Sequence, residues 1–252
     1  AWSALQEARL CIDAQLFIPS LPEAALPALA RAHPRRLIWV RQRFPHYWAD
    51  LSRGFDALMA GMSGKTRSTL RRKERRWADA CGGAIDARCY ATGRDMETFL
   101  DLAAPVSART YQHRLLGAGL PASATFRERA SSLAEAGRAF GFLLFRDGAP
   151  VAYLWCPVED DAAIYAYVGH LDEHAELSPG TVLQMFALRV LAGSGTVHFY
   201  DFAPGKGQHK QIFATGGTDC AEVVVLDRTL SNRWLVASQQ GFHSAMEHTR
   251  SW

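Results

Sequence analysis

The sequence predicts a mixed α/β fold with a mostly antiparallel sheet, and two observations carry this prediction. The first is a pair of apolar runs, 142–145 and 151–156, joined by an Asp-Gly pair at 147–148. Asp-Gly between apolar runs is the strongest short-range signal for a β-hairpin. The second is a Ser-Pro-Gly sequence at 178–180 between further apolar runs. A cap residue followed by proline marks the first turn of a helix.

The elements before the hairpin are predicted from cap residues and apolar runs. Residues 19–32 form a helical stretch interrupted by prolines, and 37–40 form a short strand. Ser63 precedes a run without helix breakers that ends at Gly82, so we expect a basic helix there. The remaining predicted elements are a strand over 84–90 and helices over 95–104 and 126–135.

The elements after the hairpin complete the predicted sheet. A third strand over 163–169 would make an antiparallel meander with the two hairpin strands. The helix that begins at Pro179, with Ser178 as its cap, extends to Gly193, because apolar residues recur at helical spacing up to that point. The predicted order ends with a strand over 197–202, a short turn or helix over 209–214 and a strand over 221–226.

The composition is that of an ordinary globular protein. With 252 residues, 48% hydrophobic and 21% charged, the chain can bury a core as one large domain or two small ones. Its 28 basic and 25 acidic residues give a net charge of +3, which is too balanced for a protein that coats nucleic acid. The longest uncharged apolar stretches are about half the length of a membrane-spanning helix, so we expect no membrane span.

The cysteines and the first residues predict where the protein occurs and whether the chain is part of a longer one. Five scattered cysteines without a C-x-x-C pair predict a reduced, cytoplasmic protein that binds no metal. The chain starts at Ala1 without a methionine, so we expect a segment of a longer protein.

Residues 65–76 hold seven basic side chains against the single acid Glu74. Arg67, Arg71 and Arg75 recur at i, i+4 and i+8, which places them on one helix face. Like charges this dense repel one another unless an anion lies nearby, and arginine binds phosphate through two parallel hydrogen bonds. A local pocket for a nucleotide, pyrophosphate or tRNA backbone is one hypothesis. A solvated face paired with acids from elsewhere is the other.

Two element ends are candidate sites for chemistry. A helix N-terminus presents free N–H groups and partial positive charge, so Ser178, Gly180 and Thr181 are candidates for binding phosphate. A plain helix start is the alternative. Asp201 follows an apolar run just before a break at Gly205, which places its carboxylate at the end of a strand. A turn-forming role for Asp201 over the following loop is its alternative.

Four motifs occur in a fixed order: the basic run 63–75, Gly-Ala-Pro-Val-Ala at 148–152, the Ser-Pro-Gly start of a helix, and Tyr-Asp-Phe at 200–202 followed by Lys210. This set resembles the GNAT superfamily of N-acyltransferases. It is most similar to the branch found in polysaccharide-biosynthesis proteins, which in turn resembles the Fem-type aminoacyl transferases. The resemblance implies helices on both faces of the sheet. It also implies a GNAT-like domain over 62–252, preceded by a segment over 1–61 that is a remnant of a first GNAT-like half.

The resemblance implies an acyltransferase that moves an acyl group from acyl-coenzyme A to an amine, on a small molecule or on a sugar or peptide precursor. The helix start and the arginine face would then bind the acyl donor. Asp201 would hold or deprotonate the amine, and Lys210 would donate to the oxyanion or to an anionic group of the acceptor. Tyr167 would protonate the leaving group, and Tyr165 on the same predicted strand and His170 at its end are further candidates for this acid. The substrate is expected in an opening between the third and fourth strands.

Two other functions stay open. The glycine-rich phosphate loop typical of the superfamily is reduced here to Gly180, and Pro179 has no N–H. This departure leaves room for an aminoacyl-tRNA as the acyl donor, as in the Fem-like relatives. The second is a non-catalytic module that binds a phosphorylated ligand. Single candidate residues also have structural roles as alternatives to chemical ones. Tyr165 and Tyr167, on a shared strand face, could pack in the core, and Lys210 could lie on the surface. His170 could lie in an exposed turn, and Cys156 could be a buried thiol.

Overall fold

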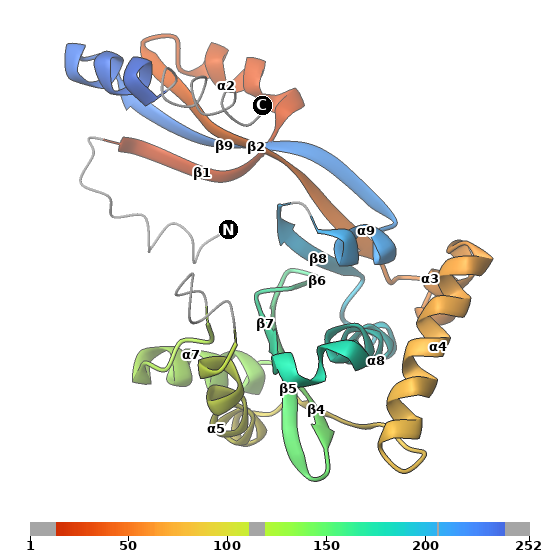
Figure 1. Cartoon of the computed structure of the whole chain (residues 1–252). Helices are drawn as coiled ribbons and strands as arrows, with labels where there is room; N and C mark the ends of the chain where they lie inside the picture. Colours follow the sequence, from red (N-terminus) through yellow and green to blue (C-terminus); the bar gives the residue numbers. More distant parts are fainter. Residues whose placement is uncertain (1–13, 111–118, 206, 240–252) are drawn as a thin grey trace. The chain divides into compact units, whose positions relative to one another are not determined.

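The computed structural model describes residues 14–110, 119–205 and 207–239 of the chain (Figure 1). The chain forms two compact units. One comprises residues 1–46, 204–206 and 218–252, and the other comprises 47–203 and 207–217. The second unit holds every candidate site residue. The origin of residues 1–61 as a remnant of a GNAT-like half stays a prediction.

The first unit contains β1 (Ala14–Pro22), η1 (Glu23–Ala25), α2 (Leu26–Ala32) and most of β2 (Arg36–Asp50) and β9 (Gly216–Asp227). β9 lies between β1 and β2 in the sheet, and β1 pairs with it antiparallel. The helical prediction for 19–32 is therefore wrong over residues 19–22, which belong to β1. β1 is at the edge of the sheet, where prolines without an N–H are tolerated. The strands predicted over 37–40 and 221–226 are confirmed, and both are longer than predicted.

The second unit is built on a mixed sheet in the order β8-β6-β5-β4-β3, with β7 also paired to β5. All of these pairs are antiparallel except β6 with β8. The hairpin is confirmed, because Asp147 and Gly148 both have positive φ (52° and 78°), as a tight turn of this type requires. The strands of this sheet are β3 Asp86–Tyr90, β4 Ala139–Arg146, β5 Ala149–Glu159, β6 Ala162–Ile164, β7 Tyr167–His170 and β8 Phe199–Pro204.

Helices cover both faces of this sheet, as expected. Figure 1 shows α5 and α7 on one side of the β4–β5 hairpin and α4 and α8 on the other. Residues 139–145 of β4 are accordingly all buried. Ser63 caps α4, because its hydroxyl accepts the N–H of Thr66. The helices are α3 Phe55–Gly61, α4 Gly64–Ala80, α5 Gly93–Ala108, α7 Ala124–Glu135, η2 Asp172–Leu177, α8 Pro179–Gly193 and α9 Gln208–Phe213.

The predicted third strand is interrupted, and this interruption opens the sheet. β6 pairs in parallel with β8 as far as Ile164 opposite Asp201, and the Tyr165 N–H then donates to the Asp201 carbonyl at 2.8 Å. Beyond this point β7 pairs with β5 and not with β8. The third and fourth strands therefore part after Tyr165 and Asp201.

The interruption also contains a β-bulge. Ala163 pairs with Val158 of β5, and Tyr167 pairs with Trp155. The second pair is thus four positions from the first along one strand (163 to 167) but only three positions along β5 (158 to 155). The extra residue turns every later side chain to the opposite face of the sheet. Tyr167 therefore faces the side opposite to Tyr165.

Candidate functional site

The start of α8 differs from the prediction in one detail. Ser178 has left-handed backbone angles (φ 58°, ψ 49°), and its side chain makes no capping hydrogen bond. Ser178 is the N-cap residue, as predicted, but its side chain does not cap the helix, because a capping serine needs extended backbone angles to reach the next turn. The Ser178 carbonyl instead accepts the N–H groups of Thr181 and Val182 at 3.0 and 3.2 Å. Pro179 occupies the first turn, as predicted.

A lysine of α4 reaches this first turn. The Lys73 ammonium donates to the Thr181 hydroxyl at 3.1 Å. Burial and the nearby charge of Arg72 lower the pKa of Lys73. A cation beside the positive end of a helix costs free energy, and a bound anion would offset that cost. The sequence offered one signal for this residue, since Lys73 lies at helical spacing between the buried Leu70 and Trp77.

His170 also lies against the start of α8. A Cβ added to Gly180 would be 3.4 Å from the His170 ring, so the two residues are in contact distance. His170 is half-buried at the end of β7, so the expected exposed turn is not what the structure has. The first turn of α8 thus faces His170 and also Lys73, which the sequence placed only in the basic run and not at this turn.

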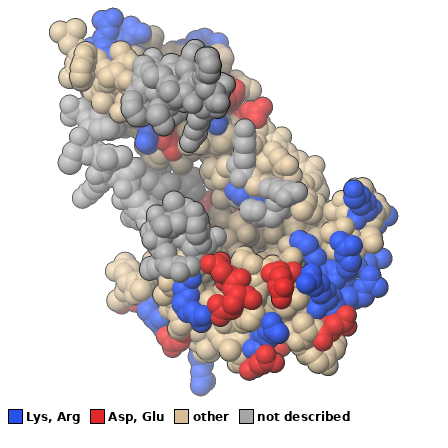
Figure 2. All heavy atoms as spheres, in the orientation of Figure 1, with Lys and Arg blue, Asp and Glu red and all other residues tan. Residues whose placement is uncertain are grey.

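The arginine face of α4 lines a separate cavity of about 610 Å³. Arg67, Arg71 and Arg75 border it together, as their spacing predicted. Lys73 is two residues from both Arg71 and Arg75, which is about 200° around the helix. The arginines and the lysine therefore lie on opposite faces of α4. Figure 2 shows the basic side chains gathered where α4 lies. The structure thus does not bring the two predicted phosphate-binding elements together.

The three arginines differ in their partners. Arg67 donates to the carbonyl oxygens of Ala60 (3.1 Å) and Met62, and so ties α4 to the end of α3. Within the described part of the chain, no carboxylate pairs with Arg71 or Arg75. Glu74, the acid on this helix face, pairs instead with Arg189 of α8 at 3.1 Å. The positive charge of two arginines is thus uncompensated by the described residues.

Asp201 and Lys210 meet at one residue. An Asp201 carboxylate oxygen accepts the Ala203 N–H at 2.7 Å, and the Lys210 ammonium donates to the Ala203 carbonyl at 3.1 Å. Ala203 has a left-handed φ of 57°, an uncommon conformation for a residue with a side chain. Asp201 therefore does form the turn that was its alternative role. Lys210 is only 9% exposed, so the alternative of a surface lysine is wrong.

The charge on Lys210 is shaped by its surroundings. Burial lowers the pKa of the Lys210 ammonium, and the negative charge of Asp201 partly opposes this effect. The two side chains are thus electrostatically coupled as well as joined through Ala203. Such a pair can hold a charged group, and the lowered pKa lets Lys210 give up its proton more readily than a solvated lysine does.

The two tyrosines of the third strand have different roles. The Tyr165 ring packs on Tyr200 and Phe202 of β8, and burial raises its pKa. Tyr165 is therefore a core residue. Tyr167 packs on Trp155 and Phe126, with ring centroids 5.8 Å apart in both cases. The expected shared face is wrong because of the bulge.

The bulge places Tyr167 on the same face of the sheet as Asp201. Side chains alternate along β8, so Asp201 faces away from the side of Tyr200 and Phe202, where Tyr165 lies. Tyr167 also faces away from Tyr165. Two of the predicted catalytic residues thus lie on one face, on either side of the point where the strands part.

The remaining predictions concern thiols, metals and membranes. Cys156 is fully buried, which raises the pKa of its thiol and confirms the expected buried cysteine. Cys11 lies outside the described residues. Among the described residues, no cluster of His, Cys, Asp or Glu is suited to a metal ion. The helices of the described segments are all too short or too polar to cross a membrane.

Comparison with known families now identifies the class of protein. Residues 64–211 match the model of the acetyltransferase (GNAT) domain, and this match covers more than half of the chain. The chain therefore belongs to the GNAT acetyltransferase-domain family. None of the curated proteins matches its sequence.

Solved structures share the fold at low sequence identity. FemX has a TM-score of 0.58 and 12% identity, over 87% of this chain and 74% of FemX. L-PGS from Bacillus licheniformis has a TM-score of 0.59 and 12% identity, over 94% of this chain and 74% of L-PGS. The third structure is the C-terminal DUF2156 domain of an Agrobacterium fabrum protein assigned as a lysylphosphatidylglycerol synthetase. It has a TM-score of 0.60 and 13% identity, over 89% of this chain and 71% of that domain's chain. The fold is thus that of a Fem-like GNAT protein.

Proposed function

We propose that this protein is an N-acyltransferase that moves an acyl group from acyl-coenzyme A to an amine of a small molecule or of a sugar or peptide precursor. The observation that carries the proposal is the parting of the strands beside Asp201, with Tyr167 on the same face of the sheet. An activated carbonyl held in this opening would be within reach of groups from both strands. The free thiols of Cys81, Cys89, Cys156 and Cys220 agree with a reducing compartment, and we propose the cytoplasm.

In the proposed reaction, the amine nitrogen attacks the thioester carbonyl. The substrate ammonium first gives a proton to Asp201, directly or through a water, and the neutral amine then forms the C–N bond as the C–S bond breaks. The Lys210 ammonium donates to the tetrahedral oxyanion or to an anionic group of the acceptor. The Tyr167 phenol protonates the thiolate that leaves.

The phosphates of coenzyme A would bind at the first turn of α8. Ser178, Gly180 and Thr181 form this turn, and Lys73 supplies a positive charge that reaches it. A phosphate there would interact favourably with both the ammonium and the helix dipole. The residues present therefore suit an anionic acyl donor, even though Pro179 offers no N–H.

The test is acyl transfer measured with acyl-coenzyme A and a panel of amines. We expect Asp201→Asn and Lys210→Ala each to lower turnover by about 10²-fold or more, since each removes a proton acceptor or an oxyanion donor. Asp79→Asn changes an exposed acid on α4 and is the matched control for Asp201→Asn. If both active-site variants keep wild-type turnover, these two residues are not catalytic.

Aminoacyl-tRNA is the second candidate acyl donor. The observation that favours it is the pair Arg71 and Arg75, which find no acidic partner among the described residues and could contact a phosphate backbone. Transfer that is abolished by ribonuclease and independent of coenzyme A would establish this alternative. Binding of a phosphorylated ligand without any transfer, unaffected by Asp201→Asn, would instead indicate a non-catalytic module.

A further inference from the structure

A second and larger cavity, of about 990 Å³, lies in the same unit and shares no lining residue with the cavity of the arginine face. The residues that line it come from the end of β2 and the loop after it, from α3, from the start of α4, from the start of β8, from α9 and from the segment that follows α9. Its volume falls at the upper end of the range of pockets that bind small molecules, about 300–1,000 Å³. Neither the candidate acyl-transfer residues nor the arginine face accounts for it.

One wall of this cavity combines an aromatic ring with a carboxylate. Trp48 and Asp50 are two residues apart on β2, so their side chains project to the same side of the strand, and both line the cavity. Phe199, which is 38% exposed, adds a second aromatic ring to the lining. An aromatic face beside a carboxylate is a suitable environment for an organic ammonium group.

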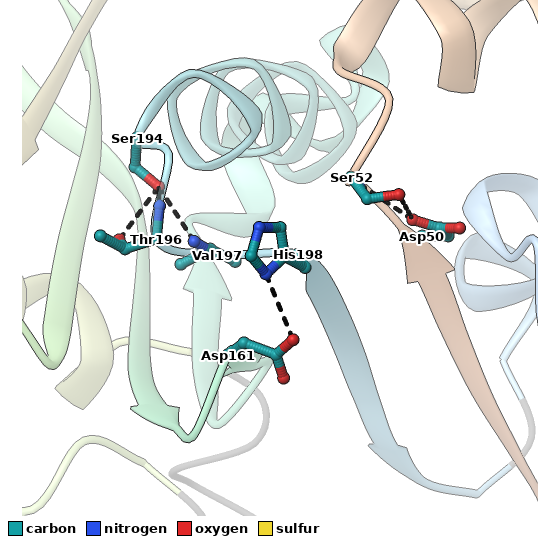
Figure 3. A network of polar contacts seen from close by, with 7 residues as sticks. All are labelled: Asp50, Ser52, Asp161, Ser194, Thr196, Val197 and His198. Carbon is teal, nitrogen blue, oxygen red and sulfur yellow. Dashed lines mark hydrogen bonds and ion pairs between the residues drawn. The ribbon is translucent and has the colours of Figure 1, made fainter.

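Asp50 is held in place as an ionised group. The N–H and the hydroxyl of Ser52 both donate to the same Asp50 oxygen, at 2.9 and 2.6 Å (Figure 3). These two hydrogen bonds lower the pKa of the Asp50 carboxyl, so the group carries its negative charge at neutral pH. No described residue bonds to the second carboxylate oxygen, which leaves that oxygen to a ligand.

The wall is fixed by the segment that follows α9. The Asp50 N–H donates to the Thr215 hydroxyl at 2.7 Å, and the Thr215 N–H donates to the Trp48 carbonyl at 2.9 Å. Gly216 also lets the chain approach the Trp48 ring, because a Cβ there would be 2.7 Å from the indole. The ring and the carboxylate are therefore positioned before any ligand binds.

The cavity also holds one positive side chain. Arg53 lines it, is exposed, and has no ion-pair partner among the residues described in the structure. Arg53 and Asp50 interact electrostatically, but they do not form an ion pair. One fixed negative and one positive group, apart from each other in one cavity, match a ligand that carries both charges.

We propose that this cavity binds a small molecule that carries an ammonium group and, separately, a carboxylate or phosphate. The ammonium lies between the Trp48 ring and the Asp50 carboxylate, and the anionic group pairs with Arg53. This inference does not depend on the proposed acyl transfer, because it concerns other residues and is tested by binding alone.

The test uses two sets of probes, with binding measured by titration calorimetry on the whole chain. The phosphate set is glucosamine 6-phosphate, with glucose 6-phosphate lacking the amine and glucosamine lacking the phosphate. The carboxylate set is glycylglycine, with its N-acetyl form lacking the charged amine and its amide lacking the carboxylate. We expect the doubly charged member of at least one set to bind about tenfold or more tighter than both of its controls. The set that responds identifies the anionic group.

Variants assign the two charges to residues. Asp50→Asn keeps an acceptor for Ser52, so the turn is retained, and it should remove the preference for the amine. Arg53→Gln should remove the preference for the anionic group. The matched controls are the exposed Asp79→Asn near the end of α4 and the exposed Arg129→Gln on α7, neither of which lines the cavity.

The outcomes separate this inference from the proposed function. Equal binding of all members within both sets, or unchanged selectivity in Asp50→Asn and Arg53→Gln, would show that the cavity is not such a site. Selective binding that survives in Asp201→Asn, even if no acyl transfer is ever detected, would support the cavity site while the proposed function fails.

Discussion

The surroundings of Lys210 disfavour its charged form. Its ammonium is buried against the Ala203 carbonyl, and burial lowers its pKa below the ordinary 10.5 despite the nearby Asp201. Between the folded and unfolded pKa values, the unfolded chain therefore binds more protons than the folded one. The stability that depends on this group rises with pH through that window, since the free energy of unfolding increases wherever the unfolded state holds more protons.

We therefore expect Lys210→Met to flatten the rise in stability as the pH increases toward 10.5, the ordinary pKa of lysine. Urea unfolding at several pH values measures it, with the exposed Lys65→Met on α4 as the control. A Lys210→Met protein whose stability relative to wild type does not change with pH would show that the lysine is not perturbed by burial.

Gly141 illustrates a close approach between a strand and a helix. A Cβ at this position of β4 would be 2.6 Å from the ring of Phe99 in α5, and that ring is fully buried. We expect Gly141→Ala to destabilise the protein by about 1–3 kcal/mol through overpacking. Gly193→Ala is the control, because nothing lies within 4 Å of its added Cβ. Urea denaturation curves in which both variants unfold at the same midpoint would contradict this account.

At the scale of elements, α4 carries two kinds of positive charge on two faces. Arg71 and Arg75 are four residues apart, and a like-charge pair at this spacing costs a helix about 0.2–0.5 kcal/mol. An anion in the cavity they line would remove this repulsion. We expect inorganic pyrophosphate to raise the melting temperature of the wild type, and this shift to be smaller in the Arg71→Ala/Arg75→Ala double variant, which keeps only the first turn of α8 as a phosphate site. Arg129→Ala is the control, and an equal shift in all three proteins would mean that the arginine face binds no anion.

Over the full chain, the sequence predicted the features that neighbouring residues determine better than those that depend on pairing between distant segments. The Asp-Gly hairpin and the Ser63 cap of α4 are encoded by a few neighbouring residues, and the structure has both. The local pattern over 19–22 predicts a helix, but these residues pair as a strand with β9, which is far away in the sequence. Elements whose geometry is decided by distant partners were thus beyond a local interpretation.

The same distinction applies to the candidate site. Asp201 and Lys210 could be chosen from the sequence, but their meeting at Ala203 depends on how β8 and α9 fold back. The face of Tyr167 is set by a single extra residue, which appears only when the third strand is registered against β5. Lys73 was one of seven similar charges, and only the packing of α4 against α8 separates it from the arginines.

The separation of Lys73 from the arginines gives a test of where the acyl donor binds. If coenzyme A phosphates bind at the first turn of α8, Lys73→Met removes a charge beside them, and we expect acyl-coenzyme A to bind about tenfold more weakly. Arg71→Ala lies on the opposite face of α4 and should leave this affinity unchanged. A tRNA bound on the arginine face would instead bind more weakly to Arg71→Ala and equally well to Lys73→Met.

Titration of both variants with acyl-coenzyme A, and with tRNA at fixed salt concentration, measures the two affinities. Equal losses in both variants would refute a separate binding face for each ligand.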